Sequence, residues 1–76
     1  MERWEAFREV EKELDVATKA HSSQVSPHEG YAIILEELDE LWEEVMKKPT
    51  ERSQTRLREE AKQVAAMAIR FMIDLT

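Results

Sequence analysis

The fold of this chain is decided by the stretch from Ser26 to Met46, which reads SPHEGYAIILEELDELWEEVM. Three helix-start signals stand together at its beginning: Ser26 as a cap, Pro27 at the first helical position, and Glu29 three residues after the cap. We predict a helix that begins at Pro27 and runs to about Lys48, where the following proline stops it.

This predicted helix is amphipathic. Its apolar residues recur at spacings of three and four and form one stripe, while glutamates occupy the opposite side. Two aromatic residues of the stripe, Tyr31 and Trp42, could stack on a nucleotide base, but their position favours packing in the core. The stripe consists of Tyr31, Ile34, Leu35, Leu38, Leu41, Trp42, Val45 and Met46.

Two further helices are predicted on either side of this segment. The first runs from about Glu2 to Ala20, with apolar residues again three or four apart, and a loop follows it over His21–Val25. The last runs from Glu51 to the end of the chain, with Thr50 as its cap. The predicted fold class is therefore all-α, with three helices in a single domain over residues 1–76.

The last predicted helix is apolar around most of its surface. Such a helix is buried on more than one side, and two other helices of similar length cannot enclose it. A core of this size also rarely supplies more than about 3–5 kcal/mol, and the chain has no cysteine for a disulfide. We therefore expect an oligomeric helical bundle. The main seam of the last helix consists of Leu57, Ala61, Val64, Ala68, Phe71, Met72 and Leu75.

The composition excludes several classes of function. The 76 residues carry 17 acidic and 11 basic side chains, a formal charge of −6, which disfavours binding to a nucleic acid duplex or an anionic membrane surface. The longest apolar run, Val64 to Ile73, is too short to cross a bilayer and contains Arg70. The first residues have no apolar signal region, so we expect a cytoplasmic protein.

An acidic face is the main functional signal. Seven carboxylates and no lysine or arginine lie between Glu29 and Met46. Glu36, Glu37 and Glu40 are three or four residues apart, so their carboxylates share one patch of the helix. A patch without a local counterion suits a hard divalent cation, Mg²⁺ or alternatively Mn²⁺. The other interpretation is a solvated face, or one that pairs with basic residues of another helix.

These same residues resemble a known family. The segments Ser26–Val45 and Leu57–Met67 are similar to the MazG-like all-α nucleoside triphosphate pyrophosphohydrolases, whose signature is E-E-x-x-E on one helix and E-x-x-D on the next. Glu36, Glu37 and Glu40 fill the first part, and Glu60 opens the second. Gln63 stands where the family has Asp; its amide oxygen can ligate Mg²⁺, but it brings no negative charge and cannot act as a general base.

The resemblance implies hydrolysis of a nucleoside triphosphate to the monophosphate and pyrophosphate. It also implies a homodimer or homotetramer of helical bundles, with active sites near subunit contacts. Glu37, Glu40 and Glu60 would hold Mg²⁺, with Gln63 as a weak further ligand. Glu36 would be another ligand or the base that orients the attacking water.

Two basic residues are candidate substrate contacts. Arg70 shares roughly one helical face with Glu60 and Gln63, so its forked donors could reach a phosphate. Its alternative role is an ion pair with the acidic face of the preceding helix or of a partner. Lys62 is open to the same two interpretations.

Gln63 also motivates a second hypothesis, a non-catalytic relative that keeps the bundle and binds a nucleotide or a protein. A third hypothesis is a helical oligomerisation module without a ligand.

Overall fold

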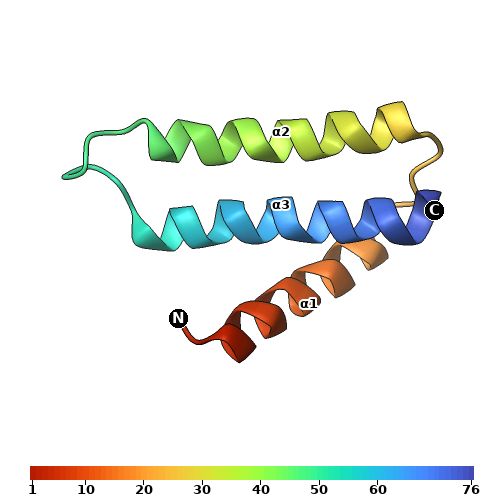
Figure 1. Cartoon of the computed structure of the whole chain (residues 1–76), viewed down its shortest axis with the longest axis horizontal. Coiled ribbons are helices and arrows are strands. Elements are labelled where there is room, and N and C mark those ends of the chain that lie inside the picture. The colour runs from red at the N-terminus through yellow and green to blue at the C-terminus, as the bar shows by residue number, and fades with distance from the viewer.

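We describe the protein from a computed structural model that covers residues 1–76. It contains three helices and no strand: α1 (Arg3–Ala20), α2 (Pro27–Val45) and α3 (Gln54–Leu75) (Figure 1). The predicted all-α class with three helices is therefore confirmed. None of the helices is both long and apolar enough to cross a membrane.

The helix α3 is the centre of the arrangement. It runs antiparallel beside α2, and α1 crosses it on another side and diverges from it towards the N-terminus (Figure 1). Both α1 and α2 pack against α3, but no Cα atom of α1 lies within 8 Å of a Cα atom of α2. The three helices therefore form an open arrangement with a gap between α1 and α2.

The start of α2 is the one that the sequence predicts. The Ser26 hydroxyl accepts a hydrogen bond from the Glu29 backbone N–H at 3.1 Å, and a Glu29 carboxylate oxygen accepts one from the Val25 N–H at 3.1 Å. The helix ends at Val45, three residues before the predicted end. The Arg52 guanidinium donates to the Val45 and Lys47 carbonyl oxygens at 2.8 and 3.0 Å, which satisfies carbonyl groups that the helix end leaves free.

The predicted start of α3 at Glu51, with Thr50 as cap, is wrong. The cap is Ser53, whose hydroxyl accepts from the Arg56 N–H at 3.1 Å, and the helix begins at Gln54. A tertiary contact selects this start, because a Glu44 carboxylate oxygen of α2 accepts a hydrogen bond from the Ser53 N–H at 2.8 Å.

Glu44 is thus a structural residue that joins two helices. Its side chain is only 2% exposed, and its carboxylate also accepts from the Lys47 ammonium at 2.9 Å and lies 3.9 Å from Arg56 Nε. The hydrogen bond from the Ser53 backbone, followed by the hydrogen bond from Lys47, lowers the pKa of this carboxyl. These partners come from the α2–α3 connection and from α3, so at Glu44 the structure agrees with the alternative of an acidic face that pairs with basic residues outside the helix.

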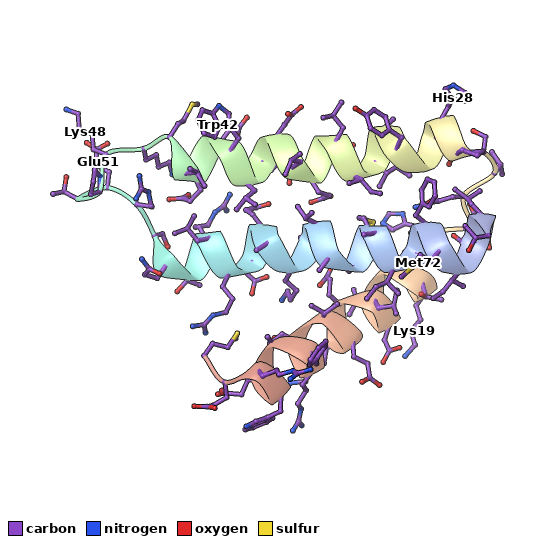
Figure 2. The ribbon with its side chains drawn as sticks, in the orientation of Figure 1. Lys19, His28, Trp42, Lys48, Glu51 and Met72 are labelled. Carbon is purple, nitrogen blue, oxygen red and sulfur yellow. The ribbon has the colours of Figure 1, made fainter.

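The hydrophobic core of the chain is small. Only Ala17, Ala66 and Met67 are buried apolar residues, with partly buried side chains around them. Tyr31 and Trp42, for which the sequence favours core packing, are 64% and 58% exposed. Trp42 projects from α2 on the side away from α3 (Figure 2). Most of the predicted apolar stripe of α2 therefore lies outside the core of this chain.

Close approach of the helices depends on Gly30, which lies on the side of α2 that faces α3. A Cβ atom at this position would lie 2.6 Å from a ring carbon of Phe71, 2.6 Å from Gln24 Oε1 and 2.8 Å from a methyl carbon of Leu75. Because these separations are too short for carbon, glycine is needed here for space.

We expect Gly30→Val to lower the free energy of unfolding by about 2 kcal/mol, since the added side chain must displace the Phe71 ring. Chemical denaturation followed by circular dichroism measures this. The control is Ala32→Val on the exposed side of the same helix. It should lower the free energy of unfolding by only a few tenths of that amount, roughly the difference in helix propensity between alanine and valine. Equal effects of the two variants would contradict close packing at Gly30.

We expect Glu44→Gln to lower the Tm at neutral pH and to leave it unchanged in acid. The pKa of Glu44 is below the ordinary 4.5, so its stabilisation is complete above that pH and is lost as the pH falls through the folded-state value. The matched control is Glu43→Gln, an exposed neighbour. A Glu44→Gln protein as stable as the parent at neutral pH would refute the role of Glu44 at the helix junction.

Candidate metal centre

Three carboxylates converge where α2 and α3 face one another. Glu37 and Glu40 lie one turn apart on α2, and Glu60 comes from α3. One carboxylate oxygen from each lies within 4.8 Å of the others. The structure therefore brings together the same three residues that the sequence predicts as metal ligands.

Glu60 is buried, Glu37 is half-buried and Glu40 is exposed, and the three carboxylates repel one another. Burial raises the pKa of the Glu37 carboxyl from 4.5 to about 7. The negative charge of Glu40 and a side-chain hydrogen bond between Glu37 and Glu40 act in the same direction. Burial also raises the pKa of Glu60, and Glu40 acts in the same direction. A raised pKa means that the ionised form is destabilised, so the cluster gains stability from a proton or a cation.

One counterion is present at the edge of the cluster. An Arg56 guanidinium nitrogen lies 3.2 Å from a Glu60 carboxylate oxygen, one helical turn away on α3. Arg56 acts to lower the pKa of Glu60, but burial and Glu40 outweigh it. Arg56 precedes Glu60 by four residues on the same helix, so this pair follows from helical spacing and needs no contact with α2. Its single charge does not neutralise three carboxylates.

A polar cavity of about 600 Å³ adjoins the cluster through Glu37. All three helices and the α1–α2 loop contribute to its wall, because it fills the gap between α1 and α2 over one side of α3. Its size is in the range that holds a small-molecule ligand. The charged or polar residues of its wall are Glu13, His21, Ser22, Gln24, Glu29, Glu36, Glu37, Gln63 and Arg70.

Two of the predicted site residues lie in this wall beside the cluster. Gln63 is half-buried on α3, one turn after Glu60, and Glu36 is exposed on α2 next to Glu37. The amide of Gln63 faces the same cavity as the carboxyl groups of Glu36 and Glu37. Glu36 and Glu37 of α2 and Gln63 of α3 therefore border one cavity, with a neutral amide as the contribution of α3.

Arg70 also lines the cavity, but its guanidinium already has protein partners. It is buried, donates to the Ser22 carbonyl oxygen at 2.8 Å and lies 3.7 Å from an Asp74 carboxylate oxygen. The ion pair is thus with its own helix, and neither α2 nor a phosphate is needed to neutralise it. The hydrogen bond to Ser22 ties the α1–α2 loop to α3, so Arg70 has a structural role whatever it contacts in a ligand.

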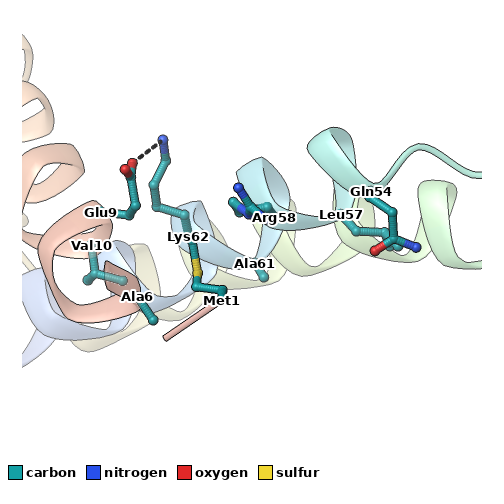
Figure 3. A pocket seen from close by; sticks show the side chains of 9 residues that line it. All are labelled: Met1, Ala6, Glu9, Val10, Gln54, Leu57, Arg58, Ala61 and Lys62. Carbon is teal, nitrogen blue, oxygen red and sulfur yellow. Dashed lines mark ion pairs between the residues drawn. The ribbon is translucent and has the colours of Figure 1, made fainter. Parts of the chain in front are cut away.

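Lys62 is not brought to the carboxylate cluster. It lies on the side of α3 that faces α1, where its ammonium is 2.9 Å from a Glu59 oxygen and 3.9 Å from a Glu9 oxygen. Figure 3 shows it at the wall of a separate, largely apolar hollow of about 380 Å³ between the N-terminal ends of α1 and α3. The hydrogen bond to Glu59 raises the pKa of Lys62, as expected for a paired ammonium.

Gln24 is a buried polar residue that the sequence did not indicate. It is 4% exposed, and neither its amide nitrogen nor its amide oxygen has a hydrogen-bond partner in the protein. Its backbone N–H donates to an Asp74 carboxylate oxygen at 3.0 Å, which holds the loop against the end of α3. A glutamine in a loop segment carries no pattern from which this burial could be predicted.

Comparison of the chain with protein-family models, curated proteins and solved structures finds no match. The resemblance to the pyrophosphohydrolase family therefore depends on the signature residues of the sequence alone.

The three carboxylates fit a hard divalent cation chemically. Oxygen ligands are those that Mg²⁺ and Mn²⁺ prefer, and Mg²⁺ commonly combines a few carboxylates with water or phosphate oxygens. The high pKa of Glu37 supports this fit, because a bound cation would replace the proton that the cluster otherwise retains.

The same pKa predicts how stability depends on pH without metal. Folded Glu37 keeps its proton to about pH 7, whereas an unfolded glutamate loses it near 4.5, so the free energy of unfolding falls as the pH rises between these values. We expect a lower Tm at about pH 8 than at about pH 6, and Mg²⁺ should restore stability at the higher pH.

Thermal denaturation at the two pH values, with and without Mg²⁺, tests this expectation. Glu37→Gln should show a smaller pH dependence and a smaller response to Mg²⁺ than the parent, whereas the exposed Glu43→Gln should behave as the parent. If the Tm of the parent protein changes neither with pH nor with Mg²⁺, the result would contradict a metal centre at Glu37.

Proposed function

We propose that this protein is a Mg²⁺-dependent nucleoside triphosphate pyrophosphohydrolase that forms a nucleoside monophosphate and pyrophosphate. The observation that carries the proposal is the convergence of Glu37, Glu40 and Glu60 beside a cavity of about 600 Å³. The order of these residues along the chain, which resembles the family signature, supports the same activity.

The charge of the cavity also supports a cation-dependent reaction. Glu13, Glu29, Glu36 and Glu37 line it, against the single guanidinium of Arg70. An anionic substrate would be repelled from such a wall unless a cation accompanies it. Substrate binding and metal binding are therefore coupled in the proposed activity.

Each residue has a defined part in this chemistry. Glu37, Glu40 and Glu60 would hold the metal, which supplies positive charge for the phosphate oxygens and lowers the pKa of bound water. Glu36 is exposed at the cavity wall next to Glu37, where its carboxylate can accept a proton from water or orient it. Gln63 would offer an amide oxygen from the facing wall.

A second candidate function is a nucleotide-binding relative without catalysis. The observation that favours it is the neutral amide of Gln63 in the cavity wall, where the family has a carboxylate. The loss of one negative charge would weaken metal binding and remove a potential base, but it would leave the cavity open to a ligand.

We also propose that the protein acts as a homo-oligomer, a dimer or a tetramer. The support is the small core of three buried apolar residues, together with many large apolar side chains that one chain leaves exposed. Burial of such side chains is the main force that drives association.

We expect purified protein with Mg²⁺ to release pyrophosphate from at least one nucleoside triphosphate. Glu40→Gln should reduce the rate about a hundredfold, the effect of losing one charged group at a reaction centre. The control is Glu43→Gln, three residues further along the same helix and outside the cluster, which should retain the parent rate. Release of pyrophosphate can be measured with a coupled phosphate assay across a panel of ribo- and deoxyribonucleotides.

Gln63→Asp separates the two candidate functions. If the parent is an enzyme, the substitution should tighten Mg²⁺ binding and keep or raise the rate. If only the Gln63→Asp protein releases pyrophosphate, the natural chain is a non-catalytic relative. Absence of both activity and nucleotide binding in both proteins would refute both candidates.

A further inference from the structure

One face of α2 has no partner within the chain. Three of its apolar residues, Tyr31, Leu38 and Trp42, are 64%, 47% and 58% exposed. From Tyr31 to Val45, the five apolar residues of this face are separated by four, three, four and three positions. This spacing produces a continuous apolar seam of the kind that packs against another helix. We call this surface the outer stripe; it consists of Tyr31, Leu35, Leu38, Trp42 and Val45.

The outer stripe lies away from the candidate metal centre. Trp42 points away from α3 in Figure 2, whereas Glu37 faces α3 and the cavity. The apolar surface continues from the stripe onto α3, since Tyr31 and Ile34 share one open hollow with Ala68 and Phe71 of α3. A second apolar hollow lies on the stripe itself, beside Leu38 and Trp42.

The exposed area indicates what covers this surface. The chain exposes 5743 Å². A compact monomer of 9.0 kDa exposes about 4,850 Å². The excess of about 900 Å² is close to the roughly 800 Å² that each partner buries in a stable protein–protein interface. One interface of ordinary size would therefore remove the excess.

The outer stripe is also self-complementary. Leu38 is its central residue, and Tyr31 and Val45 lie seven positions before and after it. In an antiparallel pair of α2 helices related by a two-fold axis at Leu38, Tyr31 would face Val45 of the partner subunit, and Leu35 would lie beside Trp42 of the partner subunit, offset by about 1.5 Å along the helix. An antiparallel pair also places the two α3 helices on the same side, so that their open apolar surfaces can meet.

We propose that a second copy of this chain docks on the outer stripe, with the two α2 helices antiparallel and Leu38 at the two-fold axis. This inference specifies the self-association proposed above and depends on it. Because the stripe and the cavity occupy different sides of α2, each copy keeps its own carboxylate cluster accessible. Dimerisation then stabilises the fold and contributes no side chain to the cluster of the other copy.

Sedimentation equilibrium and cysteine cross-linking together test the interface. We expect the parent to sediment as a dimer and Leu38→Glu to shift it towards monomer, because two charges would meet at the axis. The chain has no cysteine, so Leu38→Cys places one thiol at the axis and should form a disulfide-linked dimer on mild oxidation. Ala32→Cys, exposed on another side of α2, is the control and should cross-link far less.

The outcomes separate the proposals from one another. A folded parent that sediments as a monomer would overturn both self-association and this interface. A dimer that resists Leu38→Glu and does not cross-link through Leu38→Cys would overturn only the interface. Cross-linking through Leu38→Cys in a protein that lacks pyrophosphate release would support the interface while the proposed enzyme activity fails.

Discussion

The structure depends on carboxylates that are packed between α2 and α3. Glu44 and Glu60 are both buried there, and Glu37 is half-buried beside them. Their environments differ, because Glu44 receives a backbone N–H and the Lys47 ammonium, whereas Glu37 and Glu60 face Glu40. A charge in a poorly solvated position must be neutralised. At Glu44, near the C-terminal end of α2, the protein's own groups do this. About one to two turns earlier on α2, at Glu40 and Glu37, protein groups do not neutralise the cluster, and this is where we propose a cation.

The burial of charge between the helices has a second consequence. In most amphipathic helices the apolar side faces the core of the chain. In α2, the carboxylates of Glu37 and Glu44 lie on the side that contacts α3, and the apolar residues of the outer stripe are exposed. The chain therefore has two features without a partner in its own fold, the carboxylate cluster, for which we propose a cation, and the outer stripe, for which we propose a second copy. Since the outer stripe and the cavity occupy different sides of α2, a cation and a partner could bind independently of one another.

The candidate site residues differ in how well their contacts agree with a role in pyrophosphohydrolysis. The carboxylate cluster and the adjoining cavity are compatible with the proposed activity, and Gln63 and Glu36 both line that cavity. Arg70 and Lys62 are different, since both have protein partners that account for their charge. A role for either in substrate binding would come in addition to these structural contacts.

The convergence of Glu60 with Glu37 and Glu40 comes from the packing of α3 against α2. The sequence by itself determined the three helices, the start of α2 and the proximity of Glu37 to Glu40. These follow from local rules: the Ser26 cap, the spacing of apolar residues, and the three- and four-residue separation that places Glu37 beside Glu40. Only the tertiary structure decided the start of α3, the burial of Glu44, and which side of α2 lies outside. Those outcomes depend on contacts between residues that are distant along the chain, such as Glu44 with Ser53 and Gly30 with Phe71. A helical pattern shows which residues share a face, but it does not show which face the neighbouring helix covers.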